Sequence, residues 1–404
     1  MSNYHPLTET EAIEIASTLP GLFSAGAKLA CREIGDGNLN LVFHVSEPKT
    51  GRSIILKQAL PYAKVVGESW PLTLDRARIE SEALQIQADL APRLVPKVYA
   101  YIPELALTMM EDLSDHVILR RGLIEGHQYL EFAAHIGQFL ARTLFFTSDF
   151  GMNQQQKKIQ SGRFINPELC KITEDLIFDD PYTDSPNNQI DPGIMDVAKA
   201  LRSDHELQRH VAKLRYGFLT KGQALLHGDL HTGSIFVTKH STKVIDPEFA
   251  FYGPMGFDIG AVLANLALNF AAQGGRAHGQ TLIEMREYLA ETMISVWEQF
   301  EQHFRSLWAT HCTDRLLREA NFLDHFLAEL LQDTFGYAGC KMIRRIVGLA
   351  HVADIDGIED QTLRNRAQRA ALASGVALIK IHPQATTIHE LRDIVIRETN
   401  CQER

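Results

Sequence analysis

Three carboxylates stand near one another in the sequence, at spacings that suit phosphoryl transfer. Asp229 lies within the turn-rich stretch His227-Gly-Asp-Leu-His-Thr-Gly-Ser234, and Asp246-Pro-Glu248 follows soon after. A transferring phosphoryl group needs little covalent help, so catalysis consists of placing the acceptor hydroxyl and neutralising charge. Asp229, in its glycine-flanked turn, is placed like the base that accepts the hydroxyl proton. The pattern therefore predicts a magnesium-dependent phosphotransfer site.

The segment Asp246-Pro-Glu248 is the predicted magnesium site. The apolar run Lys243-Val-Ile-Asp246 is typical of a short strand, and Pro247 biases the residue before it toward an extended backbone. Residues two apart in an extended segment point the same way, so we expect Asp246 and Glu248 to present both carboxylates to one spot. Mg²⁺ prefers such oxygen ligands and usually shares them with substrate phosphates.

Two other interpretations of these residues stay open at this point. A single Asp-Pro-Glu segment is most often a solvated turn. His227, Asp229 and His231, at a spacing of two, could instead be ligands of a transition metal in a hydrolase, since imidazole suits zinc or iron. The hydrolase is disfavoured by the N-terminal third of the chain, whose lysine and glycine-rich turn it would leave unexplained.

That N-terminal third carries features expected of a nucleotide site. Gly35 and Gly37 lie in a glycine-rich turn that runs into the alternating residues 39–45, which predicts a hairpin. Arg52-Ser-Ile-Ile-Leu-Lys57 is a β-rich segment with one lysine amid apolar neighbours. In kinases, a third strand brings an ammonium group to the nucleotide phosphates in this way.

A helix and a further strand complete the predicted nucleotide unit. Residues 74–90 carry apolar side chains at spacings of three and four, which is typical of an amphipathic helix, and Glu80 or Glu82 could reach back to pair with Lys57. Residues 105–113 are typical of a strand that runs into an acidic link, where an adenine could bond the backbone. These parts, the base loop and the metal acids follow in the order found in kinases.

Further motifs are spread over nearly the whole chain. They are Gly-Asp-Gly-Asn-Leu-Asn40, Lys57-Gln-Ala-Leu-Pro-Tyr62, Gly67-Glu-Ser-Trp-Pro-Leu-Thr-Leu-Asp-Arg-Ala-Arg78, Met110-Glu-Asp-Leu-Ser-Asp115, Gly253-Pro-Met-Gly-Phe-Asp258 and Arg344-Arg-Ile-Val-Gly-Leu-Ala-His-Val-Ala-Asp354. With the base loop, they resemble the aminoglycoside phosphotransferase and choline kinase group of small-molecule kinases. Within that group, the resemblance is closest to the 5-methylthioribose kinase family.

The resemblance implies how ATP and Mg²⁺ are bound. Asn40 and Lys57 would contact ATP, and Asp246 and Glu248 would hold magnesium. The backbone from Glu111 through Asp112 to Leu113 would receive the adenine. The predicted ATP-binding residues are Gly35, Gly37, Asn40, Lys57, Glu80, Glu111, Asp112, Leu113, Asp246, Pro247 and Glu248.

The resemblance also implies how the acceptor is bound. Asp229 would be the base, Arg344 and Arg345 would lie in the sugar pocket, and the segment around Trp70 would form a mobile flap beside the active site. The wider small-molecule kinases often have Asn where this chain has Ser234. A serine hydroxyl is shorter than an amide, so we expect Ser234 to be the minor metal ligand and Glu248 to carry more of the metal binding.

The connection after the metal acids indicates a small acceptor. Only eleven residues separate Asp246 from Asp258, and Asp258 begins a long apolar stretch. A protein kinase has a long activation segment there, which forms a platform for a peptide. This chain has no room for one. Amphipathic segments at about 279–306, 313–336, 339–353, 360–381 and 387–399 predict a helical region that would bind the acceptor instead.

Composition narrows the class of protein. The 404 residues are 45% hydrophobic, enough for a large core. The net charge of −10 disfavours nucleic acid or an anionic membrane as a partner. The start of the chain lacks the features of a signal peptide, the apolar run at about 259–272 is shorter than a membrane span, and five scattered cysteines fit reduced thiols. We therefore expect a cytoplasmic enzyme.

The expected architecture is α+β, a two-lobed protein-kinase-like fold. Residues 1–113 would form the nucleotide-binding lobe, and residues 114–404 the mostly helical lobe with the catalytic loop and sugar pocket. The resemblance implies a homodimer that phosphorylates the 1-hydroxyl of S-methyl-5-thioribose with ATP, in methionine salvage. The alternatives are another small-molecule kinase, acting on an aminoglycoside or an amino alcohol, and a nucleotide-binding scaffold without activity. The scaffold is disfavoured because the base and the metal acids are all present.

Overall fold

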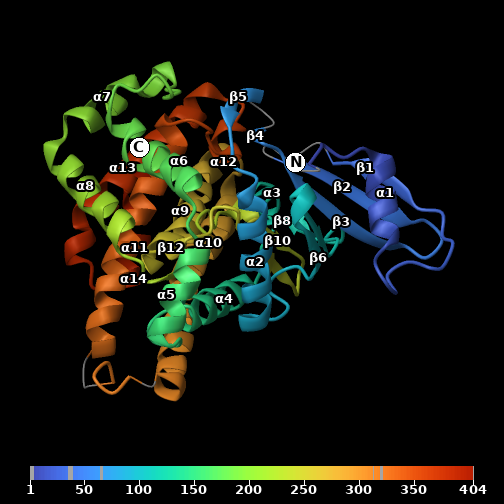
Figure 1. The fold of residues 1–404 in the computed structure, drawn as a ribbon. Coiled ribbons are helices and arrows are strands. Elements are labelled where there is room, and N and C mark those ends of the chain that lie inside the picture. Colours follow the sequence, from blue (N-terminus) through green and yellow to red (C-terminus); the bar gives the residue numbers. More distant parts are fainter. Residues whose placement is uncertain (1–3, 35–39, 64–66, 313, 319–321, 404) are drawn as a thin grey trace.

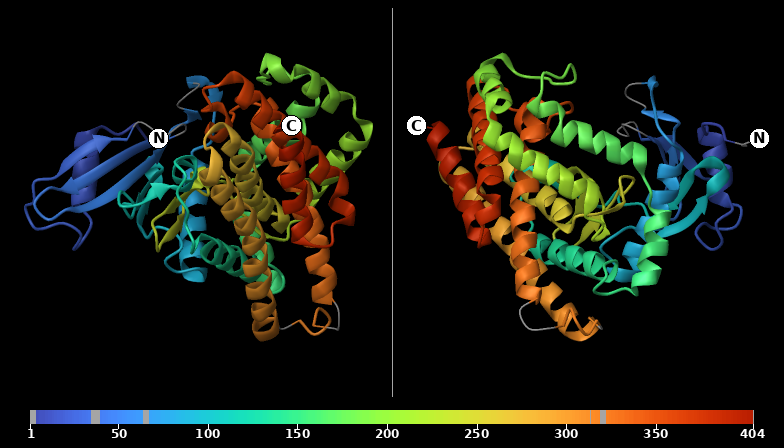
Figure 2. Two further views of the ribbon diagram at one scale, coloured as in Figure 1. Left: turned by 180° about the vertical axis from the view of Figure 1, so that it is seen from behind. Right: turned by 60° about the vertical axis from the view of Figure 1, so that its left-hand side comes forward.

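The computed structural model describes residues 4–34, 40–63, 67–312, 314–318 and 322–403, with the side chains of residues 63–70 outside this description. An antiparallel sheet, with a helix on its outer face, projects from a larger helical body (Figures 1 and 2). The α+β class predicted from the sequence is confirmed. The division at residues 113 and 114 stays a prediction.

The N-terminal sheet has five strands in the order β1-β2-β3-β7-β6, and all neighbours are antiparallel. The predicted hairpin is β1 and β2, although its turn lies outside the described residues. A two-stranded ribbon lies beside the sheet. The strands are β1 (Ala30–Glu33), β2 (Asn40–Glu47), β3 (Arg52–Ala59), β6 (Val98–Ile102) and β7 (Leu107–Met110), with β4 (Tyr62–Ala63) and β5 (Gly67–Pro71) in the ribbon.

Two helices cover opposite faces of this sheet. α1 (Glu9–Ser17) begins with the capping box between Thr8 and Glu11 and packs on the face formed by Ile54 and Leu56. Successive strand residues point to opposite faces, so Lys57 points away from α1. On that second face lies α2 (Asp75–Leu90), which contacts β3, β6 and β7. The alternation of β3 therefore directs its lysine toward the helix that carries Glu80.

Short strands connect the sheet to the helical body and frame the base loop. β8 (Val117–Ile118) pairs with β10 (Ile235–Val237), which pairs with β11 (Thr242–Val244). β9 (Ala224–Leu225) pairs with β12 (Tyr252–Gly253). The base loop thus runs between β9 and β10, and the metal-acid segment runs between β11 and β12. Antiparallel pairing of β10 with β11 brings the two segments to one place.

The helical body is built around α9 (Met255–Ala272), every residue of which is buried. α11 and α10 make its most extensive contacts, and Figure 2 shows the long helices stacked beside it. The other helices are α3 (Leu119–Ile124), α4 (Phe132–Phe146), α5 (Gln154–Arg163), α6 (Pro167–Phe178), α7 (Met195–Ser203), α8 (His205–Thr220), α10 (Gly279–His311), α11 (Phe322–Val347), α12 (Ala353–Asp356), α13 (Gln361–Ile381) and α14 (Ile388–Glu403). Six short 3₁₀ turns, η1 to η6, connect these elements within the described residues.

Two predictions from the C-terminal sequence were wrong in detail. Residues 313–336 and 339–353 do not form two helices, because α11 continues without a break through Gly336 and Gly339. Gly339, the first residue of the second predicted segment, lies inside the helix and allows close packing. A Cβ atom there would lie 2.5 Å from the backbone oxygen of Gly375 on α13. Tertiary contact therefore outweighs the low helix propensity of glycine.

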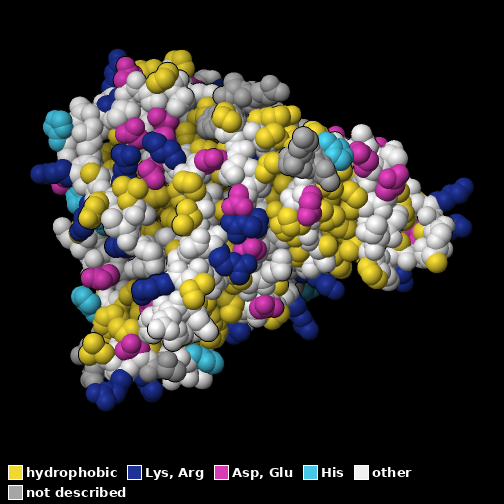
Figure 3. Space-filling view, in the orientation of Figure 1, with side chains coloured by type: hydrophobic (Ala, Val, Ile, Leu, Met, Phe, Trp, Pro, Cys, Tyr) yellow, Lys and Arg dark blue, Asp and Glu magenta, His cyan; other side chains and the backbone are white. Residues whose placement is uncertain are grey.

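The apolar run was also longer than predicted. Residues Met255–Gly275 are long and apolar enough to cross a membrane, but the whole of that apolar window is buried inside the protein. It is the central core helix of the helical body. All five cysteines are free. On the face shown in Figure 3, Lys and Arg side chains are interspersed with Asp and Glu.

Candidate active site

The base loop is fixed by backbone contacts. Gly228 has a φ of +84°, and a Cβ atom there would lie 2.2 Å from the Phe249 oxygen, so only glycine fits. The Asp258 carboxylate, at the start of α9, accepts hydrogen bonds from the amides of His227 (2.6 Å) and Gly228 (3.1 Å). Asp258 therefore holds the loop from the core helix, a role that the sequence did not suggest.

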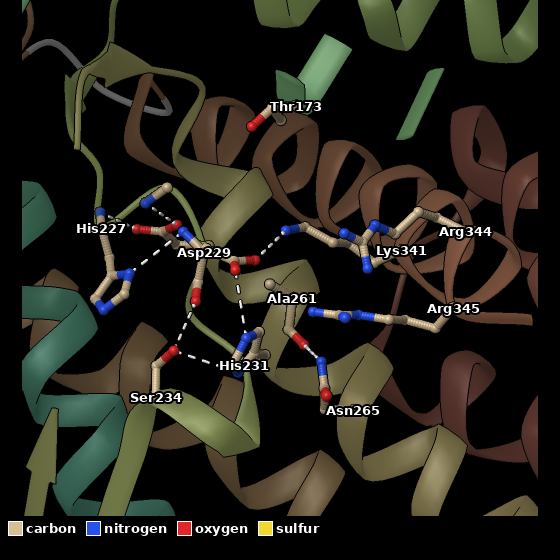
Figure 4. Close-up of polar contacts among 12 residues, drawn as sticks. Thr173, His227, Asp229, His231, Ser234, Ala261, Asn265, Lys341, Arg344 and Arg345 are labelled. Atoms are coloured by element: carbon tan, nitrogen blue, oxygen red, sulfur yellow. Dashed lines mark hydrogen bonds and ion pairs between the residues drawn. The ribbon is translucent and has the colours of Figure 1, made fainter. Parts of the chain in front are cut away.

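Asp229 projects from this loop and meets two nitrogen donors, as Figure 4 shows. Lys341 Nζ on α11 lies 3.1 Å from Asp229 Oδ1, and His231 Nε2 lies 3.3 Å from Oδ2. Burial raises the pKa of Asp229, but His231, Lys341 and Arg345 together hold it well below its usual range. Asp229 is therefore a carboxylate at neutral pH, with unshared lone pairs for an acceptor hydroxyl.

His231 is neutral and held as one tautomer. Its Nδ1 accepts the Gly233 amide at 3.0 Å, which leaves the proton on Nε2, the atom that faces Asp229. Burial lowers the pKa of His231 to about 4 and outweighs the attraction of the Asp229 carboxylate. The imidazole therefore donates a neutral hydrogen bond.

The metal acids converge through a backbone that the sequence did not predict. Asp246 has a φ of +71°, in the left-handed region, so the extended Asp-Pro-Glu segment was a wrong prediction. The carboxylates of Asp246 and Glu248 nevertheless both lie near the ammonium group of Lys57. Burial and the neighbouring Asp246 carboxylate raise the pKa of Glu248, which Lys57 and Arg76 lower in turn. A non-glycine residue in this conformation costs about 1 kcal/mol or more and is often found at active sites.

Lys57 reaches the metal acids from the sheet. Its ammonium group lies 2.8 Å from Glu80 Oε1 and also contacts Asp246 Oδ1. Glu82, the alternative partner, pairs with Arg78 and Arg163 instead. Burial raises the pKa of Glu80 to about 7, against the lowering effect of Lys57. The lysine, the helix glutamate and the metal acid are therefore brought together.

Arg76 is a member of this cluster that the sequence reasoning missed. It is fully buried on α2, and its Nη1 donates to Asn40 Oδ1 at 2.7 Å and lies 3.6 Å from Glu248 Oε2. Asn40 in turn donates from Nδ2 to Glu248 Oε2 at 3.5 Å. Arg76 thus orients the amide of Asn40 so that its Nδ2 points toward the Glu248 carboxylate. Arg76 lies three residues before Ile79 and seven before Ala83, so the helical period places it on the buried face of α2. The sequence reasoning missed it because an arginine is almost never fully buried unless it is paired.

The residues present fit a magnesium ion. Asp246 and Glu248 supply carboxylate oxygens near each other, and burial together with the Asp246 carboxylate raises the pKa of Glu248, an effect that a bound cation would offset. Among described residues, no group of three or more His, Cys, Asp or Glu is arranged to hold a metal, so phosphate oxygens would have to complete the coordination.

The alternative transition-metal site is not supported by the contacts of His227. Its Nε2 donates to the Ile245 oxygen at 2.8 Å, and its Nδ1 accepts the Asp229 amide at 3.3 Å. Both ring nitrogens are therefore used by the backbone. Ser234 also binds the loop, since its hydroxyl donates to the Asp229 carbonyl at 3.2 Å. Its part in metal binding stays a prediction.

The predicted adenine link follows β7 and is tied to neighbouring elements by its side chains. Glu111 lies 3.1 Å from Lys243 Nζ, and its amide donates to the Lys97 oxygen at 2.8 Å. Asp112 accepts from Ser53 at 2.6 Å, and Leu113 is buried. The Glu111 amide is already used, and so is the Leu113 oxygen, which accepts the His116 amide at 2.9 Å. The place of an adenine on this link therefore stays a prediction.

The arginine pair lies on α11, one turn beyond Lys341. Arg344 and Arg345 both donate to the Ala350 oxygen, at 3.2 and 3.1 Å, and Figure 4 shows their side chains extending toward the base loop. Burial and their mutual repulsion lower the pKa of Arg345. Arg120 on α3 adds a further cation, bound to Asn265 and 3.3 Å from Asp354.

Comparison with known proteins agrees with this geometry. Residues 30–290 match the phosphotransferase enzyme family (APH). The chain is 51% identical to the methylthioribose kinase of Geobacillus sp. (strain WCH70) over 97% of its own length and 96% of that protein. It is 47% identical to the methylthioribose kinase of Bacillus cereus (strain ATCC 14579), covering 97% of both chains. The chain belongs to the methylthioribose kinase family.

Among solved structures, the chain is similar to choline kinase from Cryptosporidium parvum Iowa II, with a TM-score of 0.47 at 14% identity, over 98% of this chain and 95% of that one. The family assignment rests on the sequence relatives, which also support the methylthioribose kinase interpretation over the other small-molecule kinases.

Some of the residues predicted from the family resemblance lie outside the described part of the structure. They are Gly35, Gly37 and the side chain of Trp70, whose backbone forms part of β5. Conversely, three residues lie in the site of this methylthioribose kinase family member but were not predicted as site residues: Arg76, Arg120 and Lys341. His231 was considered only as a ligand of a transition metal. Lys341 could have been found, because it lies three residues before Arg344 and so shares a helical face with it.

Proposed function

We propose that this protein transfers the γ-phosphoryl group of ATP to the 1-hydroxyl of S-methyl-5-thioribose. The observation that carries the proposal is the contact of Lys57, from the N-terminal sheet, with Asp246, from the segment beside the base loop. It joins a phosphate-binding cation to the metal acids. The names of relatives with about 50% identity support the choice of acceptor.

On the nucleotide side, Lys57 would bind the phosphates while Glu80 holds its ammonium group in place. Asn40, fixed by Arg76, would contact the phosphates beside it. Pro247 keeps its neighbours Asp246 and Glu248 in a rigid turn, and the glycines at 35 and 37 would cover the nucleotide. Mg²⁺, held by Asp246 and Glu248 with Ser234 as a minor ligand, would neutralise the phosphate charge.

On the acceptor side, Asp229 would accept a hydrogen bond from the 1-hydroxyl and take its proton as the bond to phosphorus forms. Its low pKa makes it a weak base, so its main effect is to orient the hydroxyl until late in the transfer. Arg344 and Arg345 would contact the sugar and the charge that builds on the phosphoryl group. The segment around Trp70 would close beside them.

A cationic acceptor fits this side poorly. Lys341, Arg344 and Arg345 lie near Asp229, and burial lowers the pKa of each of these three side chains. Arg120 adds a further charge beside the two arginines of α11. An amino sugar or an amino alcohol would add to that repulsion. We also infer, from the family, a cytoplasmic homodimer that acts in methionine salvage.

The direct test is ATP consumption with methylthioribose, kanamycin or choline as the acceptor, with the product followed by ³¹P NMR. We expect turnover with methylthioribose alone and a resonance from the sugar 1-phosphate. Turnover with kanamycin or choline, and none with methylthioribose, would refute the proposal.

A further inference from the structure

We propose that Lys341 is a positioning residue that fixes the Asp229 carboxylate, a role that rests on the proposed kinase function. Its ammonium group donates to Oδ1 at 3.1 Å, while His231 lies 3.3 Å from Oδ2. Each carboxylate oxygen thus has one nitrogen partner, and the partners come from different elements, α11 and the base loop. Two such contacts stop the carboxylate from rotating about its terminal bond.

Lys341 itself has little freedom. The residue is 5% exposed, and its Nζ lies 4.4 Å from the centre of the Phe257 ring, in cation–π contact. Phe257 precedes Asp258, the residue that holds the amides of His227 and Gly228. The first turn of α9 therefore braces both the loop that carries Asp229 and the lysine that contacts it.

The approach of α11 to α9 sets the reach of the lysine. A Cβ atom at Gly256 would lie 2.9 Å from the Thr334 nitrogen, and one at Gly260 would lie 2.8 Å from the Ala338 nitrogen. The two helices pack backbone against backbone at these glycines, one and two turns before Lys341. This contact places the lysine within hydrogen-bond distance of the base, and a displacement of about 1 Å at such a site can cost roughly 100-fold in rate.

The test replaces Lys341 with methionine, which keeps the length of the chain and removes the charge and the donor. We expect kcat to fall by about 30- to 100-fold, with the KM for ATP within about 3-fold of the parent. Lys341→Arg, which restores a cation and a donor, should recover part of kcat. A structural role alone would not produce this separation of kcat from KM.

The matched control is Lys157→Met. Lys157 is also a buried lysine that pairs with one aspartate, Asp149, and lies over an aromatic ring, Tyr252, but it is on α5, away from the site. We expect its kcat to stay within about 2-fold of the parent. An equal loss of kcat in Lys157→Met would show a general effect of losing a buried ion pair and would overturn the positioning role.

Further outcomes would also overturn it. One is a folded Lys341→Met enzyme with kcat within about 3-fold of the parent, and another is a rise in the acceptor KM at unchanged kcat, which would make Lys341 a binding residue. If the methionine variant does not fold, Phe257→Leu tests the same contact: we expect kcat to fall about 3- to 10-fold, and unchanged kcat would refute the proposal. If the parent does not turn over methylthioribose, the proposed function fails instead.

Discussion

The two sides of the site carry opposite charge. The nucleotide side gathers three carboxylates, Glu80, Asp246 and Glu248, around two cations, Lys57 and Arg76. The acceptor side gathers four cations, Arg120, Lys341, Arg344 and Arg345, around Asp229 and Asp354. The first side lacks positive charge and suits a divalent cation with its nucleotide. The second has a surplus and suits a neutral sugar that receives a negative phosphoryl group.

The difference also shows in how each side is held. On the nucleotide side, the sheet and α2 supply the cations, and the segment after β11 supplies two of the acids. On the acceptor side, α11 alone supplies Lys341, Arg344 and Arg345 within two turns. The nucleotide side therefore depends on the contact between the N-terminal sheet and the helical body. The acceptor side depends on the rigidity of α11.

The largest effect is expected from Asp246→Asn on the acidic side. Loss of one carboxylate leaves Glu248 as the remaining acidic ligand, so kcat/KM for ATP should fall on the order of 1,000-fold. Binding of an ATP analogue, measured by calorimetry with and without Mg²⁺, should lose its dependence on the metal. Unchanged magnesium dependence would show that Asp246 does not hold the ion.

The cationic side is tested by Arg345→Met. We expect the KM for methylthioribose to rise about 30-fold or more, while the KM for ATP stays near the parent value, because this guanidinium lies beside Asp229. Steady-state kinetics with each substrate varied gives both values. Arg286→Met is the control, since Arg286 pairs with Glu403 away from the site. A rise in the KM for ATP, with the KM for methylthioribose unchanged, would place Arg345 on the nucleotide side and contradict its assignment to the acceptor.

Arg76→Met tests whether the acidic side needs its buried cation. Removal of Arg76 leaves Glu248 buried next to Asp246, so the free energy of unfolding should fall by about 3 kcal/mol, measured by urea denaturation. Arg78 on the same helix makes partly exposed pairs, and Arg78→Met should cost less than about 1 kcal/mol. An equal loss of unfolding free energy in the two variants would mean that Arg76 stabilises the protein no more than a partly exposed arginine does.

His231 on the acceptor side should make the stability of the protein depend on pH. The pKa of His231 falls from its usual 6.5 to about 4 in the folded protein, so the unfolded chain binds the extra proton between these values. Stability from this residue is therefore full above about pH 6.5 and is lost as the pH falls toward 4, by roughly 3 kcal/mol in total.

His231→Gln keeps an N–H donor but does not titrate. We expect its free energy of unfolding to vary less than that of the parent between pH 7 and pH 4.5, as followed by urea denaturation at each pH. Identical pH dependence in the two proteins would show that His231 is not buried in its neutral form.

The sequence predicted the parts of the site better than their geometry. The alternation of β3 placed Lys57 correctly because period-two patterns are local, and Glu80 was one of two candidates on the proper helix. The left-handed backbone at Asp246 was missed because the preference imposed by Pro247 is statistical and the surrounding contacts override it. Arg76 was missed because only tertiary packing shows that a charge is buried, whereas Lys341 shares a helical face with Arg344 and could have been found from the sequence.

The most direct test of the whole account is Asp229→Asn, because Asp229 lies where the two sides meet. We predict that kcat falls on the order of 1,000-fold while the affinity for Mg²⁺ and an ATP analogue, measured by calorimetry, changes less than about 2-fold. Asparagine keeps the shape but cannot take the hydroxyl proton. A kcat within about 10-fold of the parent, or equal loss of nucleotide binding, would contradict the assignment of Asp229 as the base.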